Sequence, residues 1–386
     1  MLEYRSDMYP KYNKIVVASD SFKGSLTSFQ VAQSVERAVC EACPSCKVIK
    51  VNVADGGEGT MEALQQALGG TKVSLTVADP LNRPVQATYC ILADEMTAVL
   101  EMSAASGLTL LSSEERNPSK TSTVGTGELI RDALDRGCRK FLVGIGGSAT
   151  NDAGMGMLHA LGYRFKDAEG KELIPVGGSM VRVASIDMSA CHPALVEAEF
   201  VVACDVKAPL YGPEGAAYVF ASQKGADKAM VEDLDEGLRN LAKVSSKMMR
   251  YDCSAQEGSG AAGGLGFAFR QFLGARLEKG VEMVLDAIHF DELIHGADLV
   301  ITGEGCIDSQ TLTGKTPYGV AQRAIRQGIP VVALGGQVSI NQYQAGLAGF
   351  QGVMQVTPAD MSLEEAMRPE TAVSNIYDTI IRLISK

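Results

Sequence analysis

Four glycine-rich loops in this chain combine carboxylates, hydroxyls and lysines, the groups that bind and transfer charged small molecules. They span residues 19–25, 55–60, 144–156 and 303–315, and each follows an apolar run typical of a buried strand. Small ligands bind at the carboxyl ends of parallel strands, and the helix N-termini there favour anions. One such loop can serve only to turn the chain, but four of them favour a ligand-binding cleft.

The first loop is the most informative of the four. Its sequence, Ser19-Asp20-Ser21-Phe22-Lys23-Gly24-Ser25, lies between a strand expected at residues 14–18 and a following helix. Thr27 and Gln30 have the spacing of a capping box, and Leu26 with Val31 has that of a hydrophobic staple. An acid, hydroxyls and a lysine are therefore expected where a strand ends and a helix starts.

The fourth loop ends in Gly314-Lys315-Thr316, which mimics the end of a P-loop. Ser309 stands where a P-loop requires its earlier glycine, so we reject that motif. Thr316 is instead expected to cap a helix whose first residue is Pro317. Free N–H groups and Lys315 would favour an oxyanion or phosphate there, and an ordinary helix cap with a solvated lysine is the alternative.

Two further patterns are weak. Residues 144–149 match the dinucleotide pattern G-x-G-x-x-A, but the β-meander before them and the lack of a later strand ending in an acid argue against it. Cys40, Cys43 and Cys46 resemble part of an iron–sulfur run whose fourth position is Lys50, so a cluster is not expected. The four histidines are scattered, without a paired helical spacing.

The elements that must position these loops indicate an α/β protein. Strands are expected at 14–18, 47–53, 297–302, 330–334 and 352–356, and together they would form one parallel sheet. Residues 71–102 alternate as a β-meander, and a helix is expected at 127–136. We therefore predict two α/β domains: a Rossmann-like domain of residues 14–70 and 286–386, and an inserted mixed α/β domain of residues 71–285, after an N-terminal extension of residues 1–13.

Composition narrows the class of protein. The 386 residues carry a formal net charge of −11, which gives no basic face for nucleic acid and would repel an anionic membrane. No run approaches the length of a membrane helix, and the start of the chain lacks the apolar core of a signal peptide. Nine scattered cysteines suit a reducing cytoplasm, where we expect the protein to act.

The loops, in this order, resemble those of the type-1 glycerate kinases of bacterial sugar-acid metabolism. The matching stretches are DSFKGSL at 20–26, ADGGEGT at 54–60, GGSATNDAGMG at 146–156, and GEG at 303–305 with KTP at 315–317. The resemblance spans the chain from about Lys14 onward. Ala18-Ser19 stands where the family often has Ala-Pro, and the first 13 residues lie outside the resemblance.

The resemblance implies transfer of the ATP γ-phosphoryl group to D-glycerate with Mg²⁺, in a cleft between two α/β domains. The expected product is 2-phosphoglycerate, with 3-phosphoglycerate as the other outcome. D-Glycerate and ATP are the expected partners, and assembly into a homo-oligomer stays open. Two alternatives remain: an NAD-dependent oxidoreductase, which rests on the pattern at Gly144, and a non-catalytic sugar-acid binding protein.

Phosphoryl transfer requires neutralised phosphates, a metal bridge and an oriented hydroxyl, and the loops supply groups for each. The residues expected to bind substrate are Asp20, Ser21, Lys23 and Lys315. Asp55 and Glu304 are expected to hold Mg²⁺, because that ion prefers carboxylates, waters and phosphates.

The remaining roles concern the reacting hydroxyl and the nucleotide. Asp308 is the expected proton acceptor, with Asp205 as its alternative, and Lys23 is expected to assist catalysis. The glycine-rich loop is expected to offer backbone N–H groups to nucleotide phosphates through Gly146, Gly147, Ser148 and Asn151.

Overall fold

The structure, a computed structural model, describes residues 12–57 and 59–385. Most of the expected N-terminal extension, residues 1–11, lies outside the described residues. The chain divides into two compact units, one of residues 1–55 with 284–386 and one of residues 56–283. The first boundary differs from the residue 70 expected from sequence, because helix α2 (Thr60–Leu68) packs on strands β4 (Pro84–Leu92) and β5 (Thr97–Glu101) of the second unit.

A five-stranded parallel sheet forms the centre of the first unit, with strand order β13-β12-β11-β1-β2. The prediction of one parallel sheet built from both ends of the chain is confirmed. Ile15 of β1 pairs with Leu299 of β11 on one side and with Val48 of β2 on the other. The strands are β1 (Lys14–Val17), β2 (Lys47–Lys50), β11 (Leu299–Ile307), β12 (Val331–Val338) and β13 (Gly352–Gln355).

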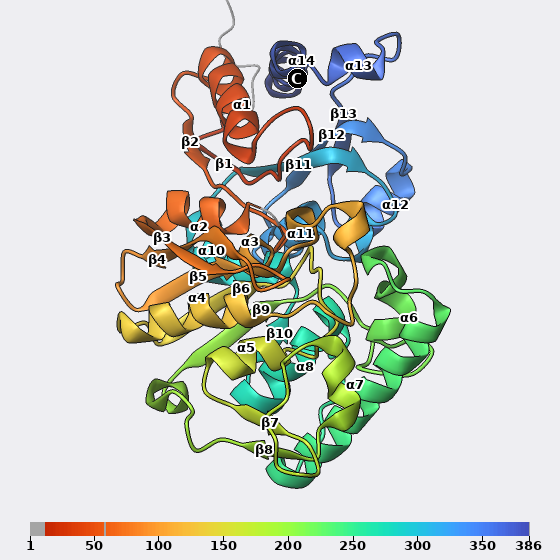
Figure 1. The fold of residues 1–386 in the computed structure, drawn as a ribbon. Coiled ribbons are helices and arrows are strands. Elements are labelled where there is room, and N and C mark those ends of the chain that lie inside the picture. The colour runs from red at the N-terminus through yellow and green to blue at the C-terminus, as the bar shows by residue number, and fades with distance from the viewer. Residues whose placement is uncertain (1–11, 58, 386) are drawn as a thin grey trace, which may run out of the picture. The chain divides into compact units, whose positions relative to one another are not determined.

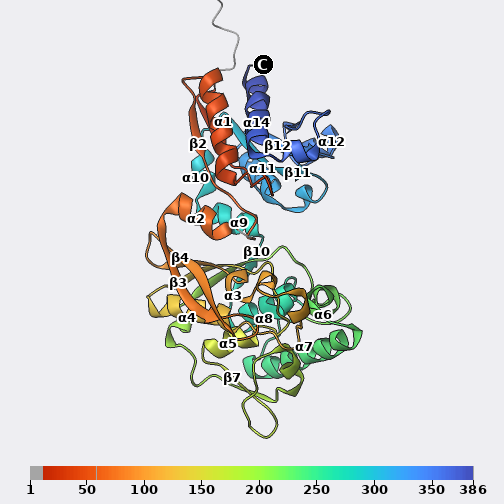
Figure 2. The ribbon, with the colours of Figure 1, turned by 45° about the horizontal axis from the view of Figure 1, so that its top comes forward.

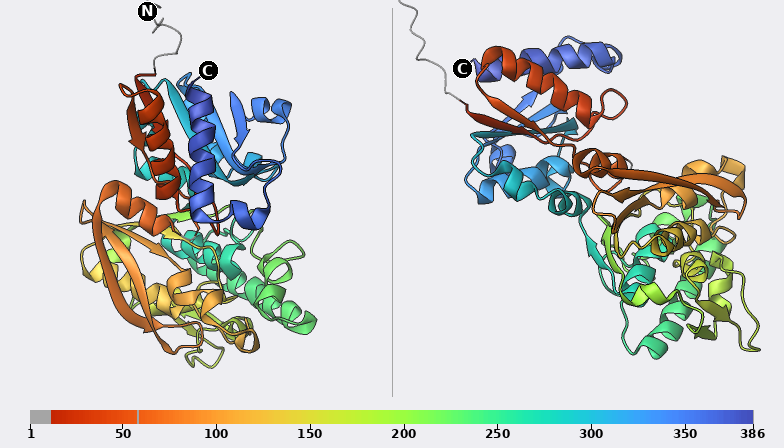
Figure 3. Two further views of the ribbon diagram at one scale, coloured as in Figure 1. Left: turned by 90° about the horizontal axis from the view of Figure 1, so that it is seen from above. Right: turned by 90° about the vertical axis from the view of Figure 1, so that its left-hand side faces the viewer.

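Helices cover both faces of this sheet, which is why its strands are continuous apolar runs. Helices α1 and α14 lie side by side on one face, and α11 lies on the other (Figure 1, Figure 3). Val35 of α1 and Ile376 of α14 join Ile15 in one buried cluster. The helices are α1 (Ser28–Ala42), α10 (Phe290–Ile294), α11 (Thr316–Arg326), α12 (Gln342–Leu347), α13 (Leu363–Ala366) and α14 (Pro369–Ile384), and η6 (Thr311–Thr313) is a 3₁₀ turn.

The capping box predicted at the start of α1 is present. The Thr27 hydroxyl accepts from the Gln30 N–H at 3.2 Å, and the Gln30 side chain accepts from the Thr27 N–H at 2.9 Å. This reciprocal cap fixes where α1 starts and therefore where the first loop ends.

The second unit contains a six-stranded mixed sheet of order β10-β9-β6-β5-β4-β3. Strands β3, β4 and β5 form the expected antiparallel meander, but β5, β6, β9 and β10 pair in parallel. The remaining strands are β3 (Gly70–Ala78), β6 (Lys140–Gly144), β9 (Glu199–Ala203) and β10 (Arg276–Glu278), with β7 (Arg164–Lys166) and β8 (Ser185–Asp187) in a separate hairpin.

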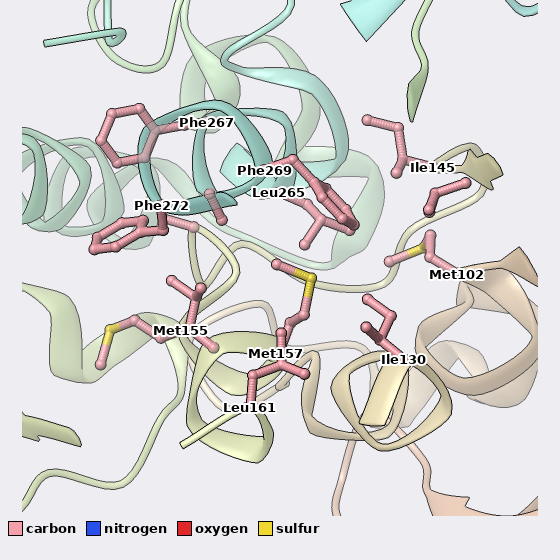
Figure 4. Packing of buried hydrophobic residues seen from close by; sticks show 14 of the residues in the cluster. Met102, Ile130, Ile145, Met155, Met157, Leu161, Leu265, Phe267, Phe269 and Phe272 are labelled. Carbon is pink, nitrogen blue, oxygen red and sulfur yellow. The ribbon is translucent and has the colours of Figure 1, made fainter. Parts of the chain in front are cut away.

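Helices pack on this mixed sheet and enclose the larger apolar core. Met155 and Met157 of α5 lie against the aromatic side chains of α8, which include Phe267 and Phe272 (Figure 4). The helices are α3 (Ser103–Ser106), α4 (Val124–Asp135), α5 (Met155–Ala160), α6 (Ala216–Phe220), α7 (Lys228–Met249), α8 (Ala261–Leu273) and α9 (Gly280–Ala287), which runs into the first unit. The 3₁₀ turns are η1 (Leu108–Leu110), η2 (Ser113–Glu115), η3 (Gly177–Arg182), η4 (Pro193–Val196) and η5 (Ser222–Lys224).

The two chain segments that enter and leave the second unit run side by side in it. A Cβ atom added to Gly56 would lie 2.5 Å from the Gly280 Cα, so only glycine fits this close approach, at a φ of +83°. Figure 2 shows α2 and α9 near these segments. Among the described residues, no helix combines the length and apolarity that crossing a membrane requires.

Candidate active site

A cavity of about 330 Å³ lies within the first unit, at the carboxyl ends of β1, β11 and β12. The charged part of its lining, called here the charged end, comprises Asp20, Lys23, Asp55, Glu304 and Lys315. The apolar part, called here the apolar end, comprises Phe22, Val356, Leu363, Ala366, Met367 and Ala372. The cavity thus joins three of the four loops singled out in the sequence.

Asp20 is fixed at the charged end by donors from both ends of the chain. The Ser21 N–H donates to its Oδ1 at 2.6 Å, and the Thr316 hydroxyl donates to its Oδ2 at 2.9 Å. The Asp20 N–H donates to the Gly303 carbonyl at 2.9 Å. These bonds hold the Asp20 carboxylate beside the start of α11.

The expected helix cap at Thr316 is wrong. Helix α11 starts at Thr316 itself, and the N-cap is Lys315, whose backbone is extended and whose side chain forms no capping bond. The Thr316 hydroxyl is drawn instead to the Asp20 carboxylate, a charged acceptor that makes a stronger hydrogen bond than a backbone group. The N–H groups at the start of α11 therefore have no side-chain cap and lie next to the charged end.

Glu304 comes from β11, which runs beyond its expected end at residue 302. The Thr311 hydroxyl donates to Glu304 Oε1 at 2.5 Å, and Lys315 Nζ lies 3.6 Å from Oε2. These contacts turn the Glu304 carboxylate toward Lys315, and both residues line the cavity.

Burial and like charge raise the pKa values of two carboxyl groups in this cluster. The pKa of Asp20 is raised above its usual value, first by burial and then by the charge of Asp55. Burial also raises the pKa of Glu304, and the charges of Asp20 and Asp308 add to the effect. Carboxylates in this state gain from a nearby cation or from accepting a proton.

The carboxylates fit a magnesium ion that is shared with phosphate. In the described residues no group of three or more His, Cys, Asp and Glu side chains could hold a metal alone. Mg²⁺ in phosphoryl-transfer sites uses one or two carboxylates and takes its other ligands from phosphate and water. The repulsion that raises the pKa of Asp20 is what such a cation would relieve.

The two residues expected to accept the proton lie outside this cavity. The Asp308 carboxylate accepts from the Gln310 N–H at 2.8 Å and the Thr311 N–H at 3.1 Å, at the start of η6. Partial burial opposes these bonds, but together with Lys315 they hold the pKa of Asp308 below its usual range. Asp205 follows β9 in the second unit, and its Oδ1 accepts from the Gly280 N–H at 3.4 Å.

The expected nucleotide loop also lies in the second unit, after β6. Gly146 and Gly147 are exposed, whereas Ser148 and Asn151 are buried. Neither polar atom of the Asn151 side chain has a hydrogen-bond partner in the structure. Gly263, at a φ of +67°, packs so closely on this loop that an added Cβ would lie 2.0 Å from the Thr150 carbonyl oxygen. Nucleotide binding by this loop stays a prediction.

Sequence reasoning missed Lys224, a lysine that is only 2% exposed. Its Nζ donates to Ser148 Oγ and to the Thr150 carbonyl, both at 2.7 Å. Burial lowers the pKa of Lys224 to about 7, opposed by the charge of Asp152. Nothing local distinguishes this lysine in the sequence, since its partners lie more than 70 residues away.

The apolar end of the cavity was also missed. Leu363, Ala366 and Met367 come from α13 and the residue after it, which contain no glycine-rich loop. An apolar helical pattern of this kind is ordinarily read as core, and only the surrounding structure identifies it as a cavity wall.

Comparison with known proteins agrees with the loops. The model of the glycerate kinase family matches residues 15–385. A glycerate kinase of Bacillus cereus is 45% identical over 355 residues, which cover 92% of this chain and 93% of the relative. A glycerate 2-kinase of Escherichia coli is 44% identical over 369 residues, covering 96% of this chain and 95% of the relative.

A solved structure extends this similarity to the fold. A crystal structure from Salmonella typhimurium LT2, described as that of a candidate glycerate kinase 2, superposes with a TM-score of 0.88. The two chains are 42% identical, and the match covers 97% of this chain and 98% of the other.

Proposed function

The chain belongs to the glycerate kinase family, and from that premise we propose that it transfers the γ-phosphoryl group of ATP to the 2-hydroxyl of D-glycerate. The products would be 2-phosphoglycerate and ADP. The observation that carries this proposal is the charged end of the cavity, where three carboxylates and two lysines meet at the start of α11. The name of the E. coli relative supports the choice of the 2-hydroxyl.

Lys23, Lys315 and Ser21 are the proposed groups that bind anionic oxygens of the substrates. Both lysines line the cavity, and Lys315 is also the N-cap of α11. A helix N-terminus with free N–H groups carries partial positive charge, which adds to that of the lysines. Such a site favours a carboxylate or a transferring phosphoryl group.

Asp20 is the proposed proton acceptor, in place of Asp308 and Asp205. It lines the cavity, and its raised pKa brings its basicity closer to neutral pH. In the proposed step the glycerate hydroxyl oxygen bonds to the γ-phosphorus while the bond from that phosphorus to the bridging oxygen of ADP breaks. The hydroxyl proton passes to the Asp20 carboxylate.

Asp55 and Glu304 are the proposed carboxylate ligands of Mg²⁺. Both line the cavity on the same end as Asp20, whose pKa is raised by the charge of Asp55. When bound, the ion would neutralise negative charge on the phosphate oxygens. The bond from Thr311 and the proximity of Lys315 keep the Glu304 carboxylate oriented.

A coupled assay for ADP tests the activity. We expect ADP release only when ATP, Mg²⁺ and D-glycerate are all present, and little with L-glycerate. Phosphorus NMR of the product should identify 2-phosphoglycerate. ADP release that does not depend on glycerate would contradict the kinase activity, and 3-phosphoglycerate as the product would contradict the choice of hydroxyl.

A further inference from the structure

The apolar end of the cavity leaves large side chains open to solvent. Leu363 is 58% exposed and Met367 is 38% exposed, although both line a concave surface. Phe22 is nearly fully buried and lines the same cavity. Apolar side chains gathered in a hollow with this exposure are typical of a ligand subsite.

This apolar end is continuous with the charged end through the first loop. A Cβ atom added to Gly24 would lie 2.8 Å from the Met367 methyl carbon, so Met367 packs directly on the residue after Lys23. One ligand can therefore contact the apolar side chains and the lysines at once.

Glycerate does not match such a surface. Each of its three carbon atoms carries oxygen, so it offers no apolar face to Leu363 or Met367. A purine ring does, because its faces are apolar while its edge carries hydrogen-bond donors and acceptors. The cavity volume of about 330 Å³ is within the range of small-molecule sites.

Two carboxamides at the cavity wall suit the edge of that ring. Gln337 and Asn375 both line the cavity, and each side chain carries a donor and an acceptor. The Asn375 Nδ2 donates to the Met361 sulfur at 3.4 Å, a weak acceptor that a ring nitrogen could replace.

We propose that the apolar end of this cavity binds the adenine ring of ATP, with the phosphates extending toward Lys23 and Lys315. This assignment rests on the proposed kinase function, and it sets the adenine subsite in the first unit. It differs from the expectation based on the glycine-rich loop at Gly146 and Gly147, which lies in the second unit.

Direct binding of ADP, measured by calorimetry, tests this assignment without requiring turnover. The variants Leu363→Glu and Met367→Glu put a charge against the ring face at exposed positions, where the new side chain can reach solvent and folding should be preserved. We expect each to weaken ADP binding at least tenfold and to raise KM for ATP, with KM for D-glycerate within twofold of wild type. Leu347→Glu is the matched control, because Leu347 is 72% exposed on α12 and does not line the cavity.

A second arm addresses the other loop. Gly146→Asp adds a negative charge where an added Cβ meets nothing closer than 4.0 Å, so the loop should keep its shape. Normal ADP binding by Leu363→Glu and Met367→Glu would overturn the proposal. If only Gly146→Asp loses ADP binding, the nucleotide site would be assigned to the loop of the second unit.

The outcomes separate this inference from the proposed function. If the wild-type protein phosphorylates D-glycerate and both cavity variants keep their affinity for ADP, the proposed function stands and the adenine subsite is overturned. If both cavity variants lose affinity for ADP but the wild-type protein does not phosphorylate D-glycerate, the adenine subsite is supported and the choice of acceptor is overturned.

Discussion

The charged end of the first unit and the loop after β6 in the second unit are built from the same kinds of residue, yet they use them differently. At the charged end, Asp20 and Glu304 line an open cavity, and like charge and burial raise their pKa values. In the loop after β6, Asp152 is buried and accepts from the Gly154 N–H, and the buried Lys224 of η5 donates to Ser148 of that loop.

The difference lies in how completely internal donors occupy the carboxylates: Asp20 accepts two hydrogen bonds, whereas Asp152 accepts four. Asp152 accepts from the Thr123 N–H and hydroxyl, both at 2.8 Å, and from the Gly154 and Gly156 N–H groups, both at 3.1 Å. A carboxylate bonded in this way stabilises the loop and has little capacity left for a ligand. Loop composition alone therefore does not distinguish a ligand site from a polar core.

The largest expected effect is on catalysis at the charged end. Asp20→Asn keeps an oxygen that can accept from the Ser21 N–H but removes the charge and the basicity. General-base catalysis contributes roughly 10²–10⁴-fold, so kcat should fall at least about 10²-fold with folding unchanged. Asp308→Asn is the matched control and should change kcat by only a few-fold. A large fall in kcat for Asp308→Asn with nearly normal kcat for Asp20→Asn would assign the proton-accepting role to Asp308.

Removing the buried lysine should affect stability rather than chemistry. Lys224→Met leaves the Thr150 carbonyl and the Ser148 hydroxyl without their donor, and an unsatisfied buried group costs about 1–3 kcal/mol. Thermal unfolding should therefore show a lower Tm at pH 10, where most of the cost of burying a protonated lysine is relieved. A normal Tm with lost ATP binding would mean that Lys224 faces a ligand after all.

The pH dependence of that stability has a definite sign. Because burial lowers the pKa of Lys224 to about 7, the unfolded chain binds one more proton than the folded chain between pH 7 and the ordinary lysine value of about 10.4. Wild type should thus gain stability over Lys224→Met as the pH rises through this window. An equal Tm difference between the two proteins at pH 7 and pH 10 would contradict the lowered pKa.

A smaller effect is expected in metal binding at the charged end. Protons compete with the cation for Glu304, whose pKa is raised by burial. The affinity for Mn²⁺ in the presence of ADP should increase with pH in the acidic range, by up to about tenfold per pH unit for each proton released. Electron paramagnetic resonance can measure this, and Glu304→Gln should flatten the curve. A flat wild-type curve would mean that the Glu304 carboxylate does not hold the metal.

The smallest effect should come from a region outside both loops. Cys40, Cys43 and Cys46 lie at and just after the end of α1, and none of them lines the cavity. Burial raises the pKa of Cys46 to about 11, which keeps its thiol protonated at neutral pH. Replacing all three with alanine should leave kcat within a few-fold, and stoichiometric iron or zinc in the purified wild-type protein would contradict this.

The sequence by itself determined the parallel sheet, the loops at its strand ends and the family. Buried strands are short apolar runs, and capping boxes such as that of Thr27 and Gln30 are encoded within a few residues, so local patterns are sufficient to predict them. The loop motifs are likewise continuous in sequence, which is why their resemblance to the glycerate kinases needed no coordinates.

Only the tertiary structure decided which charged groups face the cavity. Asp20 is held by Thr316, 296 residues away, and Lys224 is held by Ser148, 76 residues away. Whether a carboxylate or a lysine is buried, paired or open depends on such distant partners, since burial and neighbouring charge together set its pKa. That is why Asp308 looked suited to catalysis in the sequence although its carboxylate caps a turn, and why Leu363 and Met367 gave no local sign of a ligand surface.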